Sequence, residues 1–171
     1  YAVAVVGSHA YVAGGASGLV VLDVSNPNAP SVIGGCATPD PAVGVAAAGS
    51  NVYVACGWSG LLIVDVSDPA SPVVVGSVDI SNPAAPRVAG TAGDISGVKD
   101  IAVSGSRVFV TDSYIRFVVA DVSDPRAPKI VGSLTYEQAL GVAVAGSYAY
   151  VTCGSGLETI DVSNPASPPA V

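Results

Sequence analysis

One eight-residue segment recurs through this chain and limits what the chain can fold into. It reads Asp-Val-Ser, then Asn or Asp, and it contains two prolines three residues apart. Four copies in phase begin at Asp23, Asp65, Asp121 and Asp161, and a fifth with Ile in place of Val begins at Asp79. Self-similarity at a period of about 20 to 50 residues is typical of repeat architectures. The sequence therefore predicts an array of similar units.

The spacing of the four phased copies locates the units and exposes an insertion. Successive copies lie 42, 56 and 40 residues apart, and the long interval contains a 14-residue tandem duplication over 65–92. We expect this duplication to add a short strand pair at the outer edge of the second unit, with a small hairpin about Gly76 and Ser77. The chain is interpreted as a single repeat domain, 1–171. Its units are about 1–42, 43–98, 99–139 and 140–171, the last with an incomplete outer strand.

Each unit carries the pattern of four short strands. Apolar residues alternate with small ones on both sides of a Gly-Ser pair, and an aromatic-Val pair follows, as in strands joined by a tight hairpin. The Gly-Ser pairs begin at Gly7, Gly49, Gly105 and Gly146. In the second unit the strands are expected at about 43–48, 51–56, 61–66 and 73–78.

The recurring segment is predicted to be the turn between the third and fourth strands. Proline fixes φ and cannot extend a strand ladder, while the Asn or Asp before it can close a local turn. The first Asp of each copy could suggest calcium, but a calcium site needs several oxygens converging on one point. We therefore expect these carboxylates to accept hydrogen bonds from backbone N–H groups of their own turns.

Four antiparallel strands in about 40 residues, repeated, favour an all-β fold of the β-propeller type. Pro and Gly recur too often to leave a helical window of about ten residues, which excludes a helical repeat. A β-solenoid, specifically a parallel β-helix, remains the rival. The Gly-Ser hairpins favour antiparallel pairing over that rival.

The third strand and its surroundings resemble a known family. The segments LVVLD (19–23), LLIVD (61–65), FVVAD (117–121) and LETID (157–161), with the following VSxPxxP, resemble the LVIVD-repeat family of bacterial and archaeal propeller proteins. The segment 141–151 matches as well. The resemblance implies a propeller on an extracellular or cell-envelope protein. The chain departs from the family where an Asp is usual: that Asp is retained at Asp112 and replaced by Gly14, Cys56 and Cys153.

The number of units leaves the closure of the ring open. Four units could close a tight ring, form part of a larger ring, or join a second chain. Open strand edges can pair with other chains, so we expect something to cover them.

Composition excludes several classes of function. Thirteen acidic residues against six basic ones give a formal charge of −7, and the basic residues form no run, which argues against a nucleic-acid partner. Half of the residues are apolar, but no run approaches the ~18 residues of a membrane-spanning helix. The hydropathy is therefore interpreted as that of buried strands.

The residues that catalysis or metal binding would need are scarce. The only histidine, His9, occupies a variable hairpin position and is interpreted as an exposed turn residue, so no Ser-His-Asp triad is predicted. The three cysteines, Cys36, Cys56 and Cys153, are odd in number and lack CxxC spacing. We interpret Cys56 and Cys153 as buried thiols and predict no disulfide framework, metal site, cofactor or catalytic residue.

A binding site is expected where the repeats differ. In propellers the loops after the second and fourth strands share one face, and here these loops vary most. Trp58 and Tyr114 share one loop position, with charged residues nearby, which suggests a recognition patch. The candidate residues are Trp58, Tyr114, Arg116, Asp112, Tyr136 and Glu137, with Asp40, Lys99 and Asp100 close by.

From this the sequence predicts a non-enzymatic surface propeller that mediates protein–protein binding or assembly. Its partner would be a protein, self or other, held through the blade edges or through the loop face. The alternative is a glycan or small-molecule binding module, with a cation in the central channel as one version of it.

Overall fold

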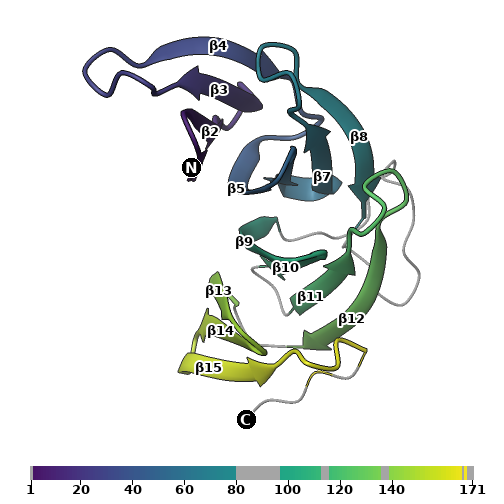
Figure 1. The fold of residues 1–171 in the computed structure, drawn as a ribbon. Coiled ribbons are helices and arrows are strands. Elements are labelled where there is room, and N and C mark those ends of the chain that lie inside the picture. Colours follow the sequence, from purple (N-terminus) through teal and green to yellow (C-terminus); the bar gives the residue numbers. More distant parts are fainter. Residues whose placement is uncertain (1, 80–96, 113–115, 136–138, 167, 169–171) are drawn as a thin grey trace.

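The computed structural model of the chain describes residues 2–79, 97–112, 116–135, 139–166 and 168. Within them the chain forms four antiparallel sheets, three of four strands and one of three (Figure 1). Each sheet is a propeller blade, and its strands lie in the order of the sequence. The all-β propeller expected from the sequence is confirmed.

The strands of the first two blades follow the predicted pattern. Blade 1 contains β1 (Val3–Val6), β2 (His9–Ala13), β3 (Leu19–Asp23) and β4 (Ser31–Cys36). Blade 2 contains β5 (Ala42–Ala48), β6 (Asn51–Cys56), β7 (Gly60–Asp65) and β8 (Val73–Val78), with a short 3₁₀ turn, η1 (Gly57–Ser59), between β6 and β7. These bounds lie within a residue of those expected for the second unit.

The last two blades repeat the arrangement. Blade 3 contains β9 (Val98–Ser104), β10 (Arg107–Asp112), β11 (Arg116–Asp121) and β12 (Lys129–Thr135). Blade 4 contains β13 (Gly141–Ala145), β14 (Tyr148–Cys153) and β15 (Gly156–Asp161). Within each blade, neighbouring strands of the described chain pair antiparallel, so the parallel β-helix alternative is wrong.

The Gly-Ser pairs form the tight hairpins that the sequence predicts. Gly7, Gly49, Gly105 and Gly146 all have φ between +58° and +59°. Glycine reaches this left-handed region without the steric cost that a Cβ imposes. The serine carbonyl then accepts a hydrogen bond from the residue after strand three, as from Val24 to Ser8 at 2.8 Å. The first hairpin is thereby tied to the proline turn of the same blade.

The small hairpin expected about Gly76 and Ser77 is wrong. β8 runs through both residues as one strand, and Gly76 and Ser77 stand opposite Ile63 and Leu62 of β7. Continuous pairing with β7 gives this strand a full ladder, whereas a two-residue turn would leave arms of only about three residues. The second copy of the duplication begins at Asp79, and the rest of it, 80–92, lies outside the described residues.

The apolar core is divided among the interfaces between blades. Each blade presents one face, here called its leading face, to the next blade, and its opposite, trailing face to the previous one. Between blades 1 and 2, Tyr11 and Leu19 share a cluster with Leu62 and Val64. Clusters of the same kind fill the interfaces between blades 2 and 3 and between blades 3 and 4. The same kind of apolar interface therefore occurs between each pair of neighbouring blades.

The proline turn of each blade also packs on the outer strand of the blade before it. A Cβ at Gly76 of β8 would overlap the carbonyl oxygen of Pro125 in the turn of blade 3. The same relation joins Gly34 to Pro69 and Gly132 to Pro165. Glycine at this place lets a neighbouring backbone approach closely.

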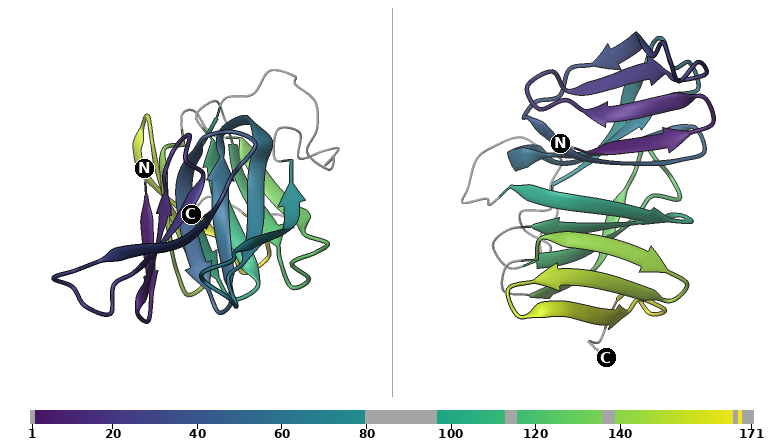
Figure 2. Two further views of the ribbon diagram at one scale, coloured as in Figure 1. Left: turned by 90° about the horizontal axis from the view of Figure 1, so that it is seen from above. Right: turned by 90° about the vertical axis from the view of Figure 1, so that its left-hand side faces the viewer.

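The four blades form an open arc. Strand-to-strand packing joins β1 to β5, β5 to β9 and β9 to β13, so that the first strands line the inside of the arc. Figure 1 shows blade 1 and blade 4 at the two ends, with the open side between them. The right-hand view of Figure 2, taken from the open side, places these blades at opposite ends of the molecule.

Candidate functional site

On one face of the arc, the loop after the second strand of blade 1 meets the connection that follows its fourth strand. Gly15, in the loop after β2, exchanges backbone hydrogen bonds of 2.9 and 3.0 Å with Ala42, at the start of β5. The loop after the second strand of one blade therefore contacts the entry to the next blade. This face, called the loop face below, carries the described candidate residues Trp58 and Asp112 and the backbone of Arg116.

Trp58 is exposed on the loop face and its loop is fixed in place. It lies in η1, and its side chain is 58% exposed. The Ser59 hydroxyl donates a hydrogen bond to a carboxylate oxygen of Asp40. The Thr38 hydroxyl donates to the backbone oxygen of Asp40 at 2.7 Å. Gly57 and Gly60 allow the turn through positive φ values of 32° and 77°. The indole is thus held out from a short loop that is fastened to the connection between blades 1 and 2.

The other described candidates form the framework of the loop face. Asp112, at the end of β10, is only 3% exposed, so its side chain lies beneath the surface. Arg116 begins β11 and its backbone pairs with Asp112 across the hairpin. Asp100 accepts hydrogen bonds of 2.9 Å from Ile101 and from Val142 of the next blade. This carboxylate fastens blade 3 to blade 4.

Tyr114, Tyr136 and Glu137 lie outside the described residues. The structure therefore places Trp58, Asp112 and the Arg116 backbone on the loop face, while the clustering of all six candidates stays a prediction.

The aspartates of the recurring turns bond to their own turns. Ser25 N–H donates to Asp23 Oδ1 at 2.8 Å. Equivalent bonds of 2.8 Å join Ser67 to Asp65, Ser123 to Asp121 and Ser163 to Asp161. Hydrogen bonds from the serines hold the pKa of all four carboxyls below the ordinary 3.8. Among the described residues, no three His, Cys, Asp or Glu side chains gather in a way that could hold a metal ion.

The three thiols are free, and two of them are buried. Burial raises the pKa of Cys56 from 9.0 to about 12, against the opposing effect of a hydrogen bond with Thr38. Burial also raises the pKa of Cys36. Cys153 lies 3.1 Å from the hydroxyl of Ser155. The thiol of Cys56 is therefore neutral at physiological pH. It is also unreactive, because the thiolate is the reactive form.

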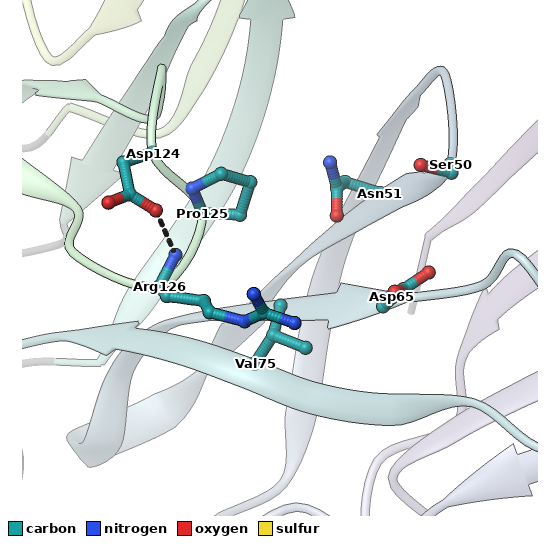
Figure 3. A pocket seen from close by; sticks show the side chains of 7 residues that line it. All are labelled: Ser50, Asn51, Asp65, Val75, Asp124, Pro125 and Arg126. Carbon is teal, nitrogen blue, oxygen red and sulfur yellow. Dashed lines mark hydrogen bonds between the residues drawn. The ribbon is translucent and has the colours of Figure 1, made fainter.

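A groove that sequence reasoning missed lies on the opposite face, between blades 2 and 3. Its volume is about 200 Å³. Figure 3 shows Arg126 reaching from the turn of blade 3 across Val75 of β8 toward Asp65. Ser50, Asn51, Asp124 and Pro125 complete the lining. The groove arises where the blade-3 turn docks on β8, so the signal for it was the repeated turn itself.

No helix in the described part of the chain is long and apolar enough to cross a membrane.

Comparison with known proteins identifies the repeat. The family model described as LVIVD repeat matches residues 1–38, 41–79, 78–94, 95–135 and 138–171, which is nearly the whole chain. The match at 78–94 falls on the second copy of the duplication. The search of curated proteins finds no match.

Solved structures that resemble the chain are β-propellers of low sequence identity. The computationally designed Ika4 protein superposes with a TM-score of 0.72 at 8% identity, covering 95% of this chain and 90% of its own. The Swd1 β-propeller domain of Myceliophteria thermophila superposes with a TM-score of 0.70 at 13% identity, and the match covers 99% of this chain and 56% of the Swd1 chain. BamB from Moraxella catarrhalis superposes with a TM-score of 0.65 at 14% identity, and the match covers 96% of this chain and 49% of the BamB chain. The chain thus spans about half the length of the last two.

Proposed function

The chain belongs to the LVIVD-repeat family, and we propose that it is a non-enzymatic propeller that binds protein partners at a bacterial or archaeal cell surface. The observation that carries this proposal is Trp58, an exposed aromatic side chain on a fastened loop. A loop held in place loses little conformational entropy on binding, so more of the contact energy of its side chains contributes to affinity. Tryptophan is among the residues most enriched at energetic centres of protein interfaces.

The neighbours of Trp58 also suit a protein partner. The connection to which the loop is fastened is acidic at Asp40, and the chain as a whole carries a formal charge of −7. An exposed aromatic residue beside charge resembles the apolar centre and polar rim of an interface. Partners with a basic rim would be favoured, since complementary charge steers association.

Three observations support a binding role over catalysis. His9, the one histidine of the chain, opens β2 next to the first hairpin. The four turn aspartates hold their own backbone, and Cys56 is protonated in the core. None of these groups is arranged as an activated nucleophile or a base beside a substrate cleft.

The glycan or small-molecule alternative has one observation in its favour, the groove of Figure 3 with its Asp65 and Arg126 side chains. Pockets that enclose a drug-sized ligand usually measure about 300 to 1,000 Å³. At about 200 Å³ the groove is smaller than this range. Protein binding through the loop face is therefore the favoured function.

Photo-crosslinking followed by mutation tests the loop face. A photoreactive phenylalanine analogue replaces Trp58 in one sample and Val73, an exposed residue of β8, in the control. With envelope extract of the source organism, we expect an adduct specific to position 58. Trp58→Ala should then weaken binding of the purified adduct protein by about 30-fold or more, as for an interface centre. Equal affinity of wild type and Trp58→Ala would contradict the proposal.

A further inference from the structure

The groove between blades 2 and 3 lies where one side chain differs between the blades. In blade 3, Arg107 at the start of β10 reaches the next blade, where its Nη1 donates to the carbonyl oxygen of Val162 at 3.0 Å. Asn51 holds the same place in blade 2, since it pairs with Asp65 as Arg107 pairs with Asp121. The Asn51 side chain is shorter, and the groove of about 200 Å³ lies beside it. The groove therefore occupies a place that an arginine side chain crosses between blades 3 and 4.

A second difference between the repeats places a cation at this groove. Arg126 lies in the proline turn of blade 3, at the position that Ala70 holds in blade 2 and Ala166 holds in blade 4. Figure 3 shows its side chain crossing Val75 toward Asp65. Within the described chain the Arg126 guanidinium makes no hydrogen bond or ion pair, and only the backbone N–H of this residue donates. The guanidinium can therefore donate to an acceptor from outside the chain.

Two carboxylates line the same groove, those of Asp65 and Asp124. Each accepts one backbone hydrogen bond through Oδ1, Asp65 from Ser67 at 2.8 Å and Asp124 from Arg126 at 3.0 Å. The hydrogen bonds of Ser67 are the main cause of the lowered pKa of Asp65, and the charge of Arg126 is a further one. Two carboxylates and one guanidinium give the groove a formal charge of −1. A simple anion would therefore meet one attracting group and two repelling ones.

The two opposite charges stand on backbone positions that the fold holds in place. Asp65 ends β7 of blade 2. The turn that carries Arg126 rests on β8, where the carbonyl oxygen of Pro125 lies against Gly76. A ligand that bridges the two charges gains charge-assisted hydrogen bonds to both blades without ordering a loop, and preorganisation of this kind favours affinity.

The volume of the groove limits the size of the ligand. At about 30 Å³ for each water molecule in the liquid, a volume of about 200 Å³ corresponds to roughly six or seven waters. A molecule with a similar number of non-hydrogen atoms fits, whereas a monosaccharide is larger. Glycine, alanine and serine are of this size, and at neutral pH each carries a carboxylate and an ammonium on the same carbon atom. Both charges that the groove offers therefore find a counterpart in one small molecule.

We propose that this groove binds a small zwitterionic α-amino acid, whose carboxylate accepts hydrogen bonds from the Arg126 guanidinium and whose ammonium donates to Asp65. The hydroxyl of Ser50 and the amide of Asn51 complete the polar lining. Such a ligand is neutral as a whole, so the negative charge of the chain does not repel it. The site goes beyond the proposed binding of proteins, since it lies on the face opposite the loop face and does not involve Trp58.

Titration of the ¹⁵N-labelled chain with L-alanine, followed by two-dimensional NMR, tests the site. The backbone amide signals of Asn51 and Asp65 should shift and saturate, while the indole signal of Trp58 stays in place. Arg126→Ala introduces the residue that the turns of blades 2 and 4 already carry, and it should weaken binding at least about tenfold. Asp65→Asn keeps an acceptor for the N–H of Ser67 but removes the charge, and should weaken binding to a similar extent. Asn51→Arg fills the groove as Arg107 does in blade 3 and should abolish binding.

Two further probes of the wild-type chain distinguish a zwitterion site from a site for a single charge. Acetate offers the carboxylate alone and methylammonium the cation alone, so each should bind at least about tenfold more weakly than L-alanine. Acetate or methylammonium that binds as tightly as L-alanine overturns the proposal. So does the absence of a saturable shift up to about 50 mM L-alanine, or an unchanged affinity in folded Arg126→Ala and Asp65→Asn.

Discussion

At the scale of single residues, the most regular feature of the chain is structural. Each recurring aspartate accepts a hydrogen bond from the serine two residues later, and the Asn or Asp further along closes a second turn of the same kind, as Asp124 does with Arg126 N–H at 3.0 Å. These local bonds explain why the segment is repeated with so little change. They also mean that these four acidic side chains stabilise their own turns.

The first prediction concerns acid stability. Two hydrogen bonds lower the pKa of Asp65 below 3.8 in the folded chain. The larger effect comes from the backbone N–H of Ser67 and the smaller from its side-chain hydroxyl. A group with a lowered folded pKa stabilises the protein at neutral pH, and this stabilisation is lost as the pH falls through the folded pKa. We therefore expect the urea midpoint of wild type to fall between about pH 7 and about pH 3, and to fall less in Asp65→Asn, which does not titrate. An equal fall in both proteins would contradict the assignment.

At the scale of elements, two contacts join each blade to the next. One is the apolar cluster between leading and trailing faces, and the other is the proline turn seated on a glycine of the preceding outer strand. Gly76 against Pro125 is the central example, since it joins the two middle blades. The turn therefore ends one strand and positions a neighbouring blade as well.

Replacing that glycine tests the second contact. Gly76→Ala puts a methyl group where the Pro125 carbonyl lies, and such overpacking typically costs about 1 to 3 kcal/mol of unfolding free energy. Gly97→Ala is the matched control, because a Cβ there meets only ordinary contacts at 3.8 Å and beyond. Its effect should stay within about 0.5 kcal/mol. Chemical denaturation measures both; equal stability of the two variants would show that the turn does not seat on β8 as described.

Most strands could be predicted because alternation and turn residues act locally. The Gly-Ser hairpins and the proline turns fix where strands begin and end, and the bounds of β5 to β8 follow from them. The hairpin about Gly76 and Ser77 was wrong for a non-local reason. The turn chemistry of Gly-Ser was present, but pairing with β7 along the whole of β8 prevailed. In this chain Gly-Ser thus forms a hairpin where the strands before and after it pair with each other. It stays within a strand where that strand pairs with a third one, as β8 does with β7.

Only part of the candidate site could be predicted from the sequence. Trp58 could be proposed because its position varies among the units, and its exposure is a property of the fold. The burial of Asp112 and the use of Asp100 to join β9 to β13 depend on the contact between blades, which no local pattern encodes. The groove at Arg126 depends on the same contact.

At the scale of the whole molecule, the repeat specifies how a blade meets its neighbour but not how many neighbours there are. Ring size follows from the angle between successive blades, and that angle is set by the packed volumes of residues such as Leu61 and Phe117. The sequence alone therefore left closure open. The structure shows four blades in an open arc, with blade 1 and blade 4 at its two ends.

Electron microscopy of the purified wild-type chain tests this account most directly. The account predicts single particles in which blade 1 and blade 4 of one chain stand apart at the two ends of an open arc. The four blades of each copy should superpose on the arc of Figure 1. Closed rings of four blades made by one chain would contradict it, because blade 4 would then cover the trailing face of its own blade 1.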